Sequence, residues 1–281
     1  MIFKQALAEA KGAGALAKCL RLCSGITLLA ALVLTAGCAS RPDAQADPEA
    51  FAEYEQINDP LEPFNRAVFQ FNRGLDAMLL KPLAIFYQDL LPPPFQRGIR
   101  NVLSNLREPQ TFFNDLLQAQ PERAGTTLMR FVINSTLGVG GLNEVASDFG
   151  WEHHEEDFGQ TLAVWGVDDG PYLMLPVLGP SSPRDATGRV VDSLVIDPFG
   201  LLGAVLIEDS EWLTTFSITR GVLSAAEQRA RVLGQLEELE RTSLDFYAAI
   251  RSGYRQNREH QVQDGLLHVP SYPPKSEGNQ K

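Results

Sequence analysis

Apolar residues recur with the period of an α-helix along residues 64–80. At 100° per residue, seven of them fall on one stripe that is about 120° wide, and six polar residues fall opposite. Phe69 and Leu80 interrupt the polar side, so we expect both sides of this helix to be partly buried. The stripe consists of Phe64, Ala67, Val68, Phe71, Leu75, Met78 and Leu79.

Prolines mark further helix boundaries. Pro82 predicts the start of a shorter helix, and the run Pro92-Pro93-Pro94 predicts its end. Pro109 and Pro121 each suit the first turn of another helix. In the C-terminal third, Thr242-Ser243-Leu244-Asp245 offers a capping box before a helical pattern. Strand signals are nearly absent, so the sequence predicts an all-α fold.

Glycines divide the middle of the chain. A helix is expected to end near Thr136, and residues 158–165 are again helical in pattern. Residues 171–180 are strongly apolar, but their prolines exclude a regular helix. A short turn that contains Gly166 and Gly170 joins residues 158–165 to residues 171–180. We therefore expect these two segments to form the arms of a hairpin.

The N-terminal region has the features of a lipoprotein signal peptide. Lys18 and Arg21 precede an apolar run that is short for a membrane span, and the run ends in Thr35-Ala36-Gly37-Cys38. Leucine usually stands three places before the cysteine, whereas here it stands four places before, at Leu34. We expect cleavage after residue 37, lipid on Cys38 and a flexible tether over residues 38–57. An uncleaved anchor or an ordinary secretory signal is the alternative.

Cysteine content and charge narrow the possible partners. Cys19 and Cys23 lie in the expected signal peptide, so the mature chain has no internal disulfide and no paired-thiolate metal site. Residues 1–37 hold four basic residues and one acidic residue, which leaves 20 basic and 34 acidic residues, a net charge of −14. Such a surface disfavours nucleic acid. No mature stretch approaches ~20 apolar residues, so no transmembrane helix is expected. Aspartate directly after the lipidated cysteine would suggest retention in the inner membrane. Ala39 stands at that position instead, which favours the outer membrane.

Motifs of enzymes are missing from the sequence: there is no nucleophile elbow, phosphate-binding loop or dinucleotide fingerprint. His153 and Asp157 are four residues apart, but two ligands do not make a metal site, and a solvated acidic helix start is the simpler interpretation. Arg184-Asp185 with Asp192 could suggest acid–base chemistry, but a helix start after Ser182-Pro183 is the simpler interpretation. We therefore expect no catalysis, no cofactor and no metal.

Amphipathic helices tethered to a bilayer are typical of a protein that acts on or in the membrane surface. The alternative is that the apolar stripes form an ordinary soluble core. Periodicity by itself favours the ordinary soluble core.

Several motifs stand out from residue 58 onward, among them Asn58-Asp59-Pro60-Leu61-Glu62-Pro63-Phe64-Asn65-Arg66, Asn134-Ser135-Thr136-Leu137-Gly138 and Leu178-Gly179-Pro180. In these motifs the sequence resembles the MlaA (VacJ) family, the outer-membrane lipoproteins of the system that maintains lipid asymmetry. The resemblance spans about residues 58–260 and contains many motifs in the family's order. Asp168 stands where the family often has glycine, and Glu144 where it often has aspartate. The motif residues that we single out are Asp59, Pro60, Glu62, Asn65, Arg66, Phe71, Asn72, Gly138, Gly140, Gly141, Gly159, Gly179, Pro180, Arg184 and Asp185.

The resemblance implies a fold and a function. It implies a ring of amphipathic helices in the plane of the inner leaflet of the outer membrane, over residues 58–264, with a disordered tail at 265–281. A central channel would take phospholipid misplaced in the outer leaflet and pass it to a soluble periplasmic carrier (MlaC-like). Trimeric porins are the implied partners. The region of Gly166, Asp168, Gly170 and Pro171 is implied to move beside the channel, and we expect Gly166→Pro to leave the protein folded but to impair lipid removal.

Two alternatives to lipid transport remain open. The first is a lipid-anchored scaffold that packs around a porin and moves no lipid. The second is an enzyme such as a phospholipase.

Overall fold

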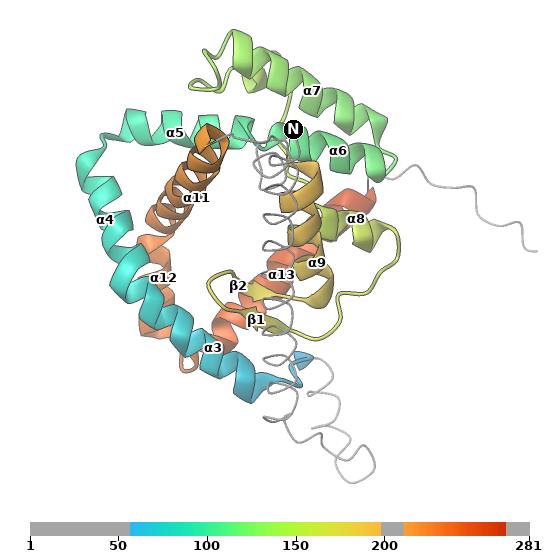
Figure 1. Ribbon diagram of the computed structural model, residues 1–281. Coiled ribbons are helices and arrows are strands. Elements are labelled where there is room, and N and C mark those ends of the chain that lie inside the picture. Colours follow the sequence, from blue (N-terminus) through green and yellow to red (C-terminus); the bar gives the residue numbers. More distant parts are fainter. Residues whose placement is uncertain (1–56, 198–210, 268–281) are drawn as a thin grey trace, which may run out of the picture. The chain divides into compact units, whose positions relative to one another are not determined.

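The computed structural model describes residues 57–197 and 211–267 (Figure 1). By its contacts the chain divides into two units, Met1–Ala67 and Val68–Lys281. The described part of the first unit is residues 57–67, where buried Asp59 accepts a hydrogen bond from Asn65 Nδ2 at 2.7 Å. Arg66 Nε donates to Glu62 at 2.7 Å in the same segment. The expected signal peptide, Cys38 and residues 38–56 of the tether lie outside the described residues, as do residues 268–281.

The described residues are predominantly helical, and the prediction of an all-α class is confirmed. The N-terminal helices are α3 (Glu62–Leu75), the π turn η1 (Asp76–Leu80), α4 (Lys81–Leu90), α5 (Pro93–Asn105), α6 (Glu108–Leu117) and α7 (Pro121–Thr136). A 3-10 turn η2 (Ala146–Phe149) and α8 (Phe158–Val164) follow. After a hairpin of β1 (Leu173–Leu175) and β2 (Gly179–Ser181) come α9 (Pro183–Val191), η3 (Asp192–Ile196), α11 (Glu211–Arg231), α12 (Leu233–Thr242) and α13 (Phe246–Leu267).

Helix boundaries follow the prolines, as predicted. Pro109 and Pro121 lie in the first turn of a helix, where the missing N–H costs no hydrogen bond. Pro82 lies in the first turn of α4, which continues directly from the π turn η1. Arg184 and Asp185 lie in the first turn of α9, and the Ser182 side chain caps that helix by accepting from the Asp185 N–H. The helix-start interpretation of this motif is therefore confirmed.

Two local predictions are wrong. Thr242 does not cap α13, because it is the last residue of α12, and the Asp245 side chain accepts from the Ala248 N–H instead. Residues 153–157 are not the first turn of a helix but an irregular segment, and α8 begins after it with Asp157 as its N-cap. In both cases a carboxylate nearer the helix takes the capping position, because aspartate caps as well as serine or threonine.

The apolar run at 171–180 does not serve as one arm of a hairpin with residues 158–165, as predicted, but folds back on itself. Its strands pair antiparallel, Leu173 with Ser181 and Leu175 with Gly179. Asn72 on α3 holds its turn from both sides. Its Nδ2 donates to the Leu175 carbonyl at 2.9 Å, and its Oδ1 accepts from the Val177 N–H at 2.8 Å.

The helices of the second unit contact one another in a closed circuit. It runs from α5 to α7, α6, α8, α13, α12 and α11, and α11 returns to α5 (Figure 1). On its other side α11 packs against α4 and η1. There a small apolar core forms around Ala84, Tyr87, Ala226 and Ala230.

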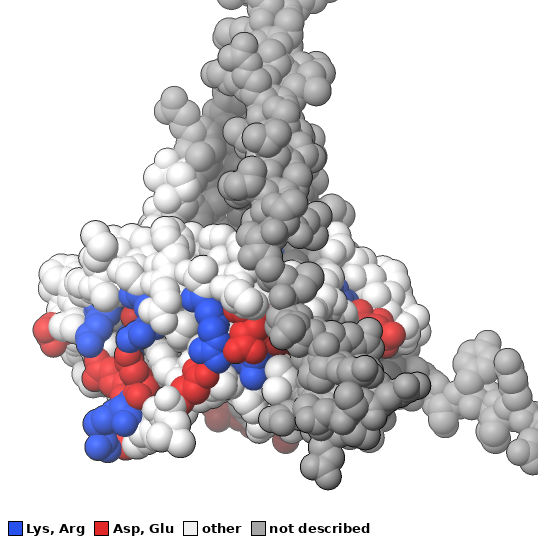
Figure 2. All heavy atoms as spheres, turned by 90° about the horizontal axis from the view of Figure 1, so that it is seen from below, with Lys and Arg blue, Asp and Glu red and all other residues white. Residues whose placement is uncertain are grey.

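The distribution of polar and apolar residues is inverted relative to a soluble protein. Among the described residues, twenty buried residues are polar or charged and only twelve are hydrophobic, while 27 large hydrophobic residues are exposed. Buried polar groups and exposed apolar surface are the informative departures from the usual pattern. Figure 2 shows one face on which Lys, Arg, Asp and Glu gather in the lower part, with an uncharged layer above them.

The stripe at residues 64–80 follows this inversion. Phe71 is 57% exposed, Met78 83% and Leu79 56%, so most of the stripe faces outward. Val68 on the stripe and Phe69 beside it are buried. The interpretation of the stripe as ordinary soluble core is therefore wrong for these three residues. In the described ranges, 57–197 and 211–267, no helix is both long and apolar enough to cross a bilayer.

Candidate functional site

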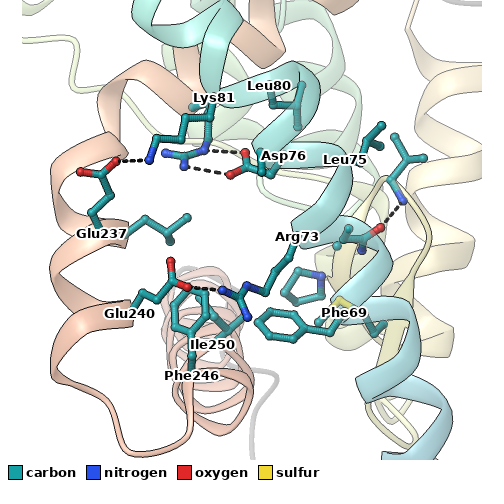
Figure 3. A pocket seen from close by; sticks show the side chains of 18 residues that line it. Phe69, Arg73, Leu75, Asp76, Leu80, Lys81, Glu237, Glu240, Phe246 and Ile250 are labelled. Atoms are coloured by element: carbon teal, nitrogen blue, oxygen red, sulfur yellow. Dashed lines mark hydrogen bonds and ion pairs between the residues drawn. The ribbon is translucent and has the colours of Figure 1, made fainter.

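A pocket of about 390 Å³ lies between α3 with η1, the β hairpin, and the helices α11, α12 and α13 (Figure 3). All of its lining residues belong to the second unit. Three of the motif residues line it: Gly179 and Pro180 from the hairpin and Asn72 from α3. Segments more than 150 residues apart in sequence therefore build one site.

One part of the pocket wall is apolar. Phe69 packs against Phe246 with ring centroids 5.5 Å apart, and Met174, Leu236 and Ile250 continue this surface. The aromatic contacts extend behind the wall, since Phe69 also meets Tyr247, and Tyr247 meets Tyr172. Tilted and edge-to-face pairs of this kind stiffen the wall beyond simple burial.

The rest of the wall carries three ion pairs, each joining the α3–α4 side to the α11–α12 side. Arg229 on α11 binds Asp76 with two hydrogen bonds, Nε at 2.7 Å and Nη2 at 2.9 Å. Arg229 is 10% exposed, and its Nη1 is buried without a hydrogen-bond partner in the described structure. A bidentate pair of this kind fixes geometry as well as charge.

The other two pairs are half-exposed. Lys81 contacts Glu237 at 2.7 Å, and Arg73 contacts Glu240 (Figure 3). The Lys81 ammonium holds the pKa of the Glu237 carboxyl below its usual range. Pairs so open to water contribute little to stability, so their side chains can exchange partners at low cost. The pocket therefore combines an apolar surface with exchangeable charges of both signs.

The π turn places two of these charged residues together. In an α-helix, residues five apart point about 140° away from each other. In η1 the Lys81 N–H instead donates to the Asp76 carbonyl, an i to i+5 bond. Asp76 and Lys81 consequently both line the pocket.

A buried polar network lies on the other side of the second unit, among α6, α7, α8, α9 and α13. Arg258 binds Asp157 with two hydrogen bonds of 2.7 Å and reaches Asp185 at 2.9 Å. Tyr254 donates to the same Asp185 carboxylate. Arg258 lowers the pKa of Asp185 against the opposing effect of burial. This network uses all its charges internally, so we assign it a structural role.

Asp192 belongs to the same network. It accepts from Asn114 Nδ2 at 3.1 Å and from the Phe158 N–H at 3.0 Å, and burial raises its pKa to about 6. Asp192 thus joins η3 to α6 and α8 and has structural partners on both sides. Acid–base chemistry with Arg184 is not needed to explain its position.

Comparison with known proteins identifies the family. The family model described as MlaA lipoprotein matches residues 57–261. The chain belongs to the MlaA lipoprotein family. Within this family it is 33% identical over 244 residues to the intermembrane phospholipid transport system lipoprotein MlaA of Haemophilus influenzae, covering 85% of this chain and 90% of that protein.

The chain is also similar to other members of the MlaA family. The protein of the same name from Escherichia coli strain K12 is 33% identical over 215 residues, which is 75% of this chain and 80% of that protein. A solved structure from "Structural basis for maintenance of bacterial outer membrane lipid asymmetry" has a TM-score of 0.61 and 35% identity, over 73% of this chain and 98% of that chain. The resemblance found in the sequence is therefore confirmed.

Several MlaA-family motif residues serve backbone packing rather than the pocket. Gly159 and Gly188 lie where α8 and α9 approach closely. Gly138 follows α7 so closely that a Cβ would lie 2.4 Å from the Asn134 carbonyl oxygen. Gly140 and Gly141 have φ of +69° and +87°, so this turn favours glycine. Pro60 lies in a turn, half-buried, and Phe71 faces outward.

The turn between α8 and the hairpin contains the predicted hinge residues. Gly166 has φ of +86° and Gly170 φ of +72°. The Gly166 N–H donates to the Ala163 carbonyl at 2.9 Å, so glycine here also ends α8. Asp168 is exposed and Pro171 is half-buried. None of the four lines the pocket.

Sequence reasoning missed the α11–α12 side of the pocket. Arg229, Glu237 and Glu240 belong to no motif that we recognised, and their partners lie more than 150 residues earlier. His153 contacts Glu108 and Glu155, and His154 contacts Asp115. Within the described part of the chain, no group of three or more His, Cys, Asp or Glu side chains could hold a metal ion.

Proposed function

We propose that this protein removes misplaced phospholipid from the outer leaflet of the outer membrane and passes it to a soluble periplasmic carrier. The observation that carries the proposal is the pocket of Figure 3, which offers an apolar wall and charges of both signs side by side. A phospholipid has the same division into tails and a charged headgroup. The names of the relatives support a role in phospholipid transport.

The pocket is best matched to part of a lipid. Its volume of about 390 Å³ is near the lower end of ligand pockets, which span about 300–1,000 Å³. A headgroup with the first part of its chains would fit, with the phosphate near Arg73, Lys81 or Arg229 and the chains against Phe246 and Ile250. In this proposal the circuit of helices surrounds the lipid path as a ring, and the pocket is one station on it.

The exposed apolar residues support a position within a membrane leaflet. Side chains such as Met78 and Leu79 lose contact with water if the helices lie in the membrane plane. Lipid on Cys38 would anchor the chain there. Intact-mass spectrometry tests the anchor: loss of residues 1–37 together with a diacylglyceryl group supports it, and an unlipidated mature protein that starts elsewhere contradicts it.

Replacing a charged pair of the pocket tests lipid removal. Lys81→Leu with Glu237→Leu removes both half-exposed partners and leaves no unpaired charge. We expect this double variant to fold but to leave phospholipid in the outer leaflet of a deletion strain that it complements. Arg241→Leu with Glu238→Leu is the matched control, because this exposed pair lies on α12 outside the pocket. Normal asymmetry with the pocket variant would contradict the proposal.

The same strains examine the scaffold alternative. If the protein only packs around a trimeric porin, deleting it should leave the lipid distribution unchanged once porin levels are restored. Co-purification with the porin is expected for both double variants, since neither pair belongs to the outward-facing apolar residues. Lost porin binding by the pocket variant alone would favour the scaffold.

We further propose that the hairpin moves beside the lipid path. Its turn is joined to α3 through the two hydrogen bonds of Asn72, so this contact would hold the closed position. Asn72→Leu should increase hydrogen exchange at residues 173–181 and change the rate of lipid removal. Gln256→Leu, exposed on α13 and outside the pocket lining, is the control. Faster exchange with an unchanged transport rate would contradict a role in gating.

A further inference from the structure

A second pocket, of about 330 Å³, lies between α5, α7, η2 and the C-terminal end of α11. Its lining is almost entirely polar, and five cationic side chains contribute to it: Arg100, Arg107, Arg130, Arg231 and His153. Among the described residues that line it, Leu103 is the one apolar side chain. We call it the basic pocket.

Two carboxylates of the basic pocket are each shared by two cations. Buried Glu227 contacts Arg100 Nε at 2.6 Å and Arg231 Nη2 at 3.5 Å. Exposed Glu155 contacts His153 Nε2 at 3.5 Å and Arg107 Nη1 at 3.9 Å. One carboxylate cannot neutralise two cations, so positive charge remains around Glu227, whereas His153 has a second carboxylate partner.

The fifth cation, Arg130, has two carboxylate partners. Arg130 contacts Glu108 at 3.1 Å and Glu144 at 2.9 Å, and Glu108 also meets His153 Nδ1 at 3.5 Å. Counting Glu108, five cations face four carboxylates. These contacts also raise the pKa of His153, to about 9, so its ring is cationic at neutral pH. The pocket is thus net positive in a chain whose net charge is −11.

The donors of the basic pocket are open to a ligand. The Arg100 and Arg107 side chains are each 43% exposed and that of Arg231 is 53% exposed. Guanidinium groups match the geometry of phosphate oxygens and bind them with two parallel hydrogen bonds. The hydroxyls of Ser104 and Ser224 add neutral donors.

We propose that the basic pocket binds a phosphate group, held by Arg100, Arg107 and Arg231 with His153. The phosphate can belong to a lipid headgroup or to a soluble molecule, because both present the same oxyanion. This site is separate from the amphipathic pocket of Figure 3, and its existence does not depend on lipid removal.

Binding of inorganic phosphate to the purified full chain in detergent tests the site, followed by ³¹P line broadening or calorimetry at constant ionic strength. Arg231→Gln should weaken binding by about fivefold, which corresponds to ~1 kcal/mol. Glu227 keeps Arg100 as its partner in this variant, so the buried carboxylate stays paired. Arg241→Gln, on the exposed part of α12, should leave the affinity unchanged.

A variant that is expected to bind phosphate more tightly distinguishes a loss of the site from simple misfolding. Glu155→Gln removes a 55% exposed carboxylate that competes for Arg107 and His153, and it should tighten phosphate binding by about threefold, ~0.7 kcal/mol. Unchanged affinity in both Arg231→Gln and Glu155→Gln would overturn the proposal, as would equal loss in the Arg241→Gln control.

The source of the phosphate is settled by vesicles. Flotation with phosphatidylcholine vesicles, with and without added phosphatidylglycerol, is compared for the parent chain and Arg231→Gln. A lipid phosphate predicts that Arg231→Gln binds the phosphatidylglycerol vesicles less than the parent does and that inorganic phosphate competes. Equal vesicle binding with weakened phosphate binding assigns the site to a soluble ligand. Absence of phosphate binding by the parent in both formats refutes the site.

Discussion

Gly188 of α9 lies directly against the backbone of Gly159 in α8. A Cβ at Gly188 would be 2.4 Å from the Gly159 nitrogen and 2.7 Å from its Cα, both of which are backbone atoms that cannot turn aside. The two helices therefore meet where neither carries a side chain. Asp157 and Asp185, which share Arg258, both lie close to Gly159 at this crossing.

Gly188→Ala should consequently destabilise the protein strongly, by about 2–4 kcal/mol, through forced separation of α8 and α9. Chemical denaturation in detergent measures the change. Gly125→Ala is the control, because a Cβ on that α7 glycine meets nothing within 4 Å. The control should gain ~0.5–1 kcal/mol from helix propensity. Equal stability of the two variants would show that the crossing is looser than described.

Removing outward-facing apolar side chains of the stripe should weaken membrane binding without unfolding. In a Cys38→Ala background, Phe71→Gln, Met78→Gln and Leu79→Gln together should lower vesicle partitioning by at least about tenfold, because each large apolar side chain contributes ~1.5 kcal/mol or more when buried. Circular dichroism should show unchanged helix content. Val68→Gln, at a buried position of the same helix, should instead destabilise the fold. A Cys38→Ala chain that is monomeric in plain buffer would contradict membrane insertion.

Stability should depend on pH through His153. Its pKa is raised to about 9 from 6.5 by the Glu108 and Glu155 carboxylates, against burial and the Arg130 charge. Its contribution is fully present below pH ~6.5 and is lost as the pH rises through about 9. The ring is 39% exposed, so solvent screening reduces the effect to ~1 kcal/mol. His153→Gln should lower the unfolding midpoint at pH 6 and approach the parent at pH 10. His260→Gln, exposed on α13, should lie on the parent curve at both values.

The backbone conformation at residue 166 requires glycine, so Gly166→Pro is not a suitable variant for testing a hinge. Proline cannot adopt φ of +86°, and it would lose the hydrogen bond to the Ala163 carbonyl. Gly166→Pro should therefore cost about 3 kcal/mol or more rather than leave the fold intact. Gly166→Ala keeps the N–H and should cost ~1–2 kcal/mol. Thermal unfolding of the two variants ranks them, and a stable Gly166→Pro protein would show that the turn is free to adopt another conformation.

The sequence predicted helix positions better than it predicted which way the helices face. Proline at a first turn has a local cause, so Pro82, Pro109 and Pro121 marked helix starts correctly. The stripe at 64–80 was also found by its period. Whether a stripe meets core or membrane depends on what surrounds it, and the period contains no such information. Met78 at 83% exposure and fully buried Asn65 therefore became visible only in the structure.

The candidate site was predictable only on the hairpin and α3. Asn72, Gly179 and Pro180 belong to motifs that the sequence displays directly. Arg229, Glu237 and Glu240 lie in helices of ordinary charged composition, where a surface ion pair and a pocket lining have the same pattern. Long-range pairing such as that of Arg229 with Asp76, 153 residues apart, leaves no local signature.

The π turn η1 determines the direction in which every side chain of α4 points around the helix axis. Because its hydrogen bonds join residues five apart, it contains one residue more than an α-helix of the same rotation would need. Shortening the chain by one residue there would leave the composition and the helix almost unaltered, yet it would turn α4 by about 100° about its axis. Lys81 would rotate away from Glu237 and Tyr87 away from Ala226, so site and core are tied to the same added residue.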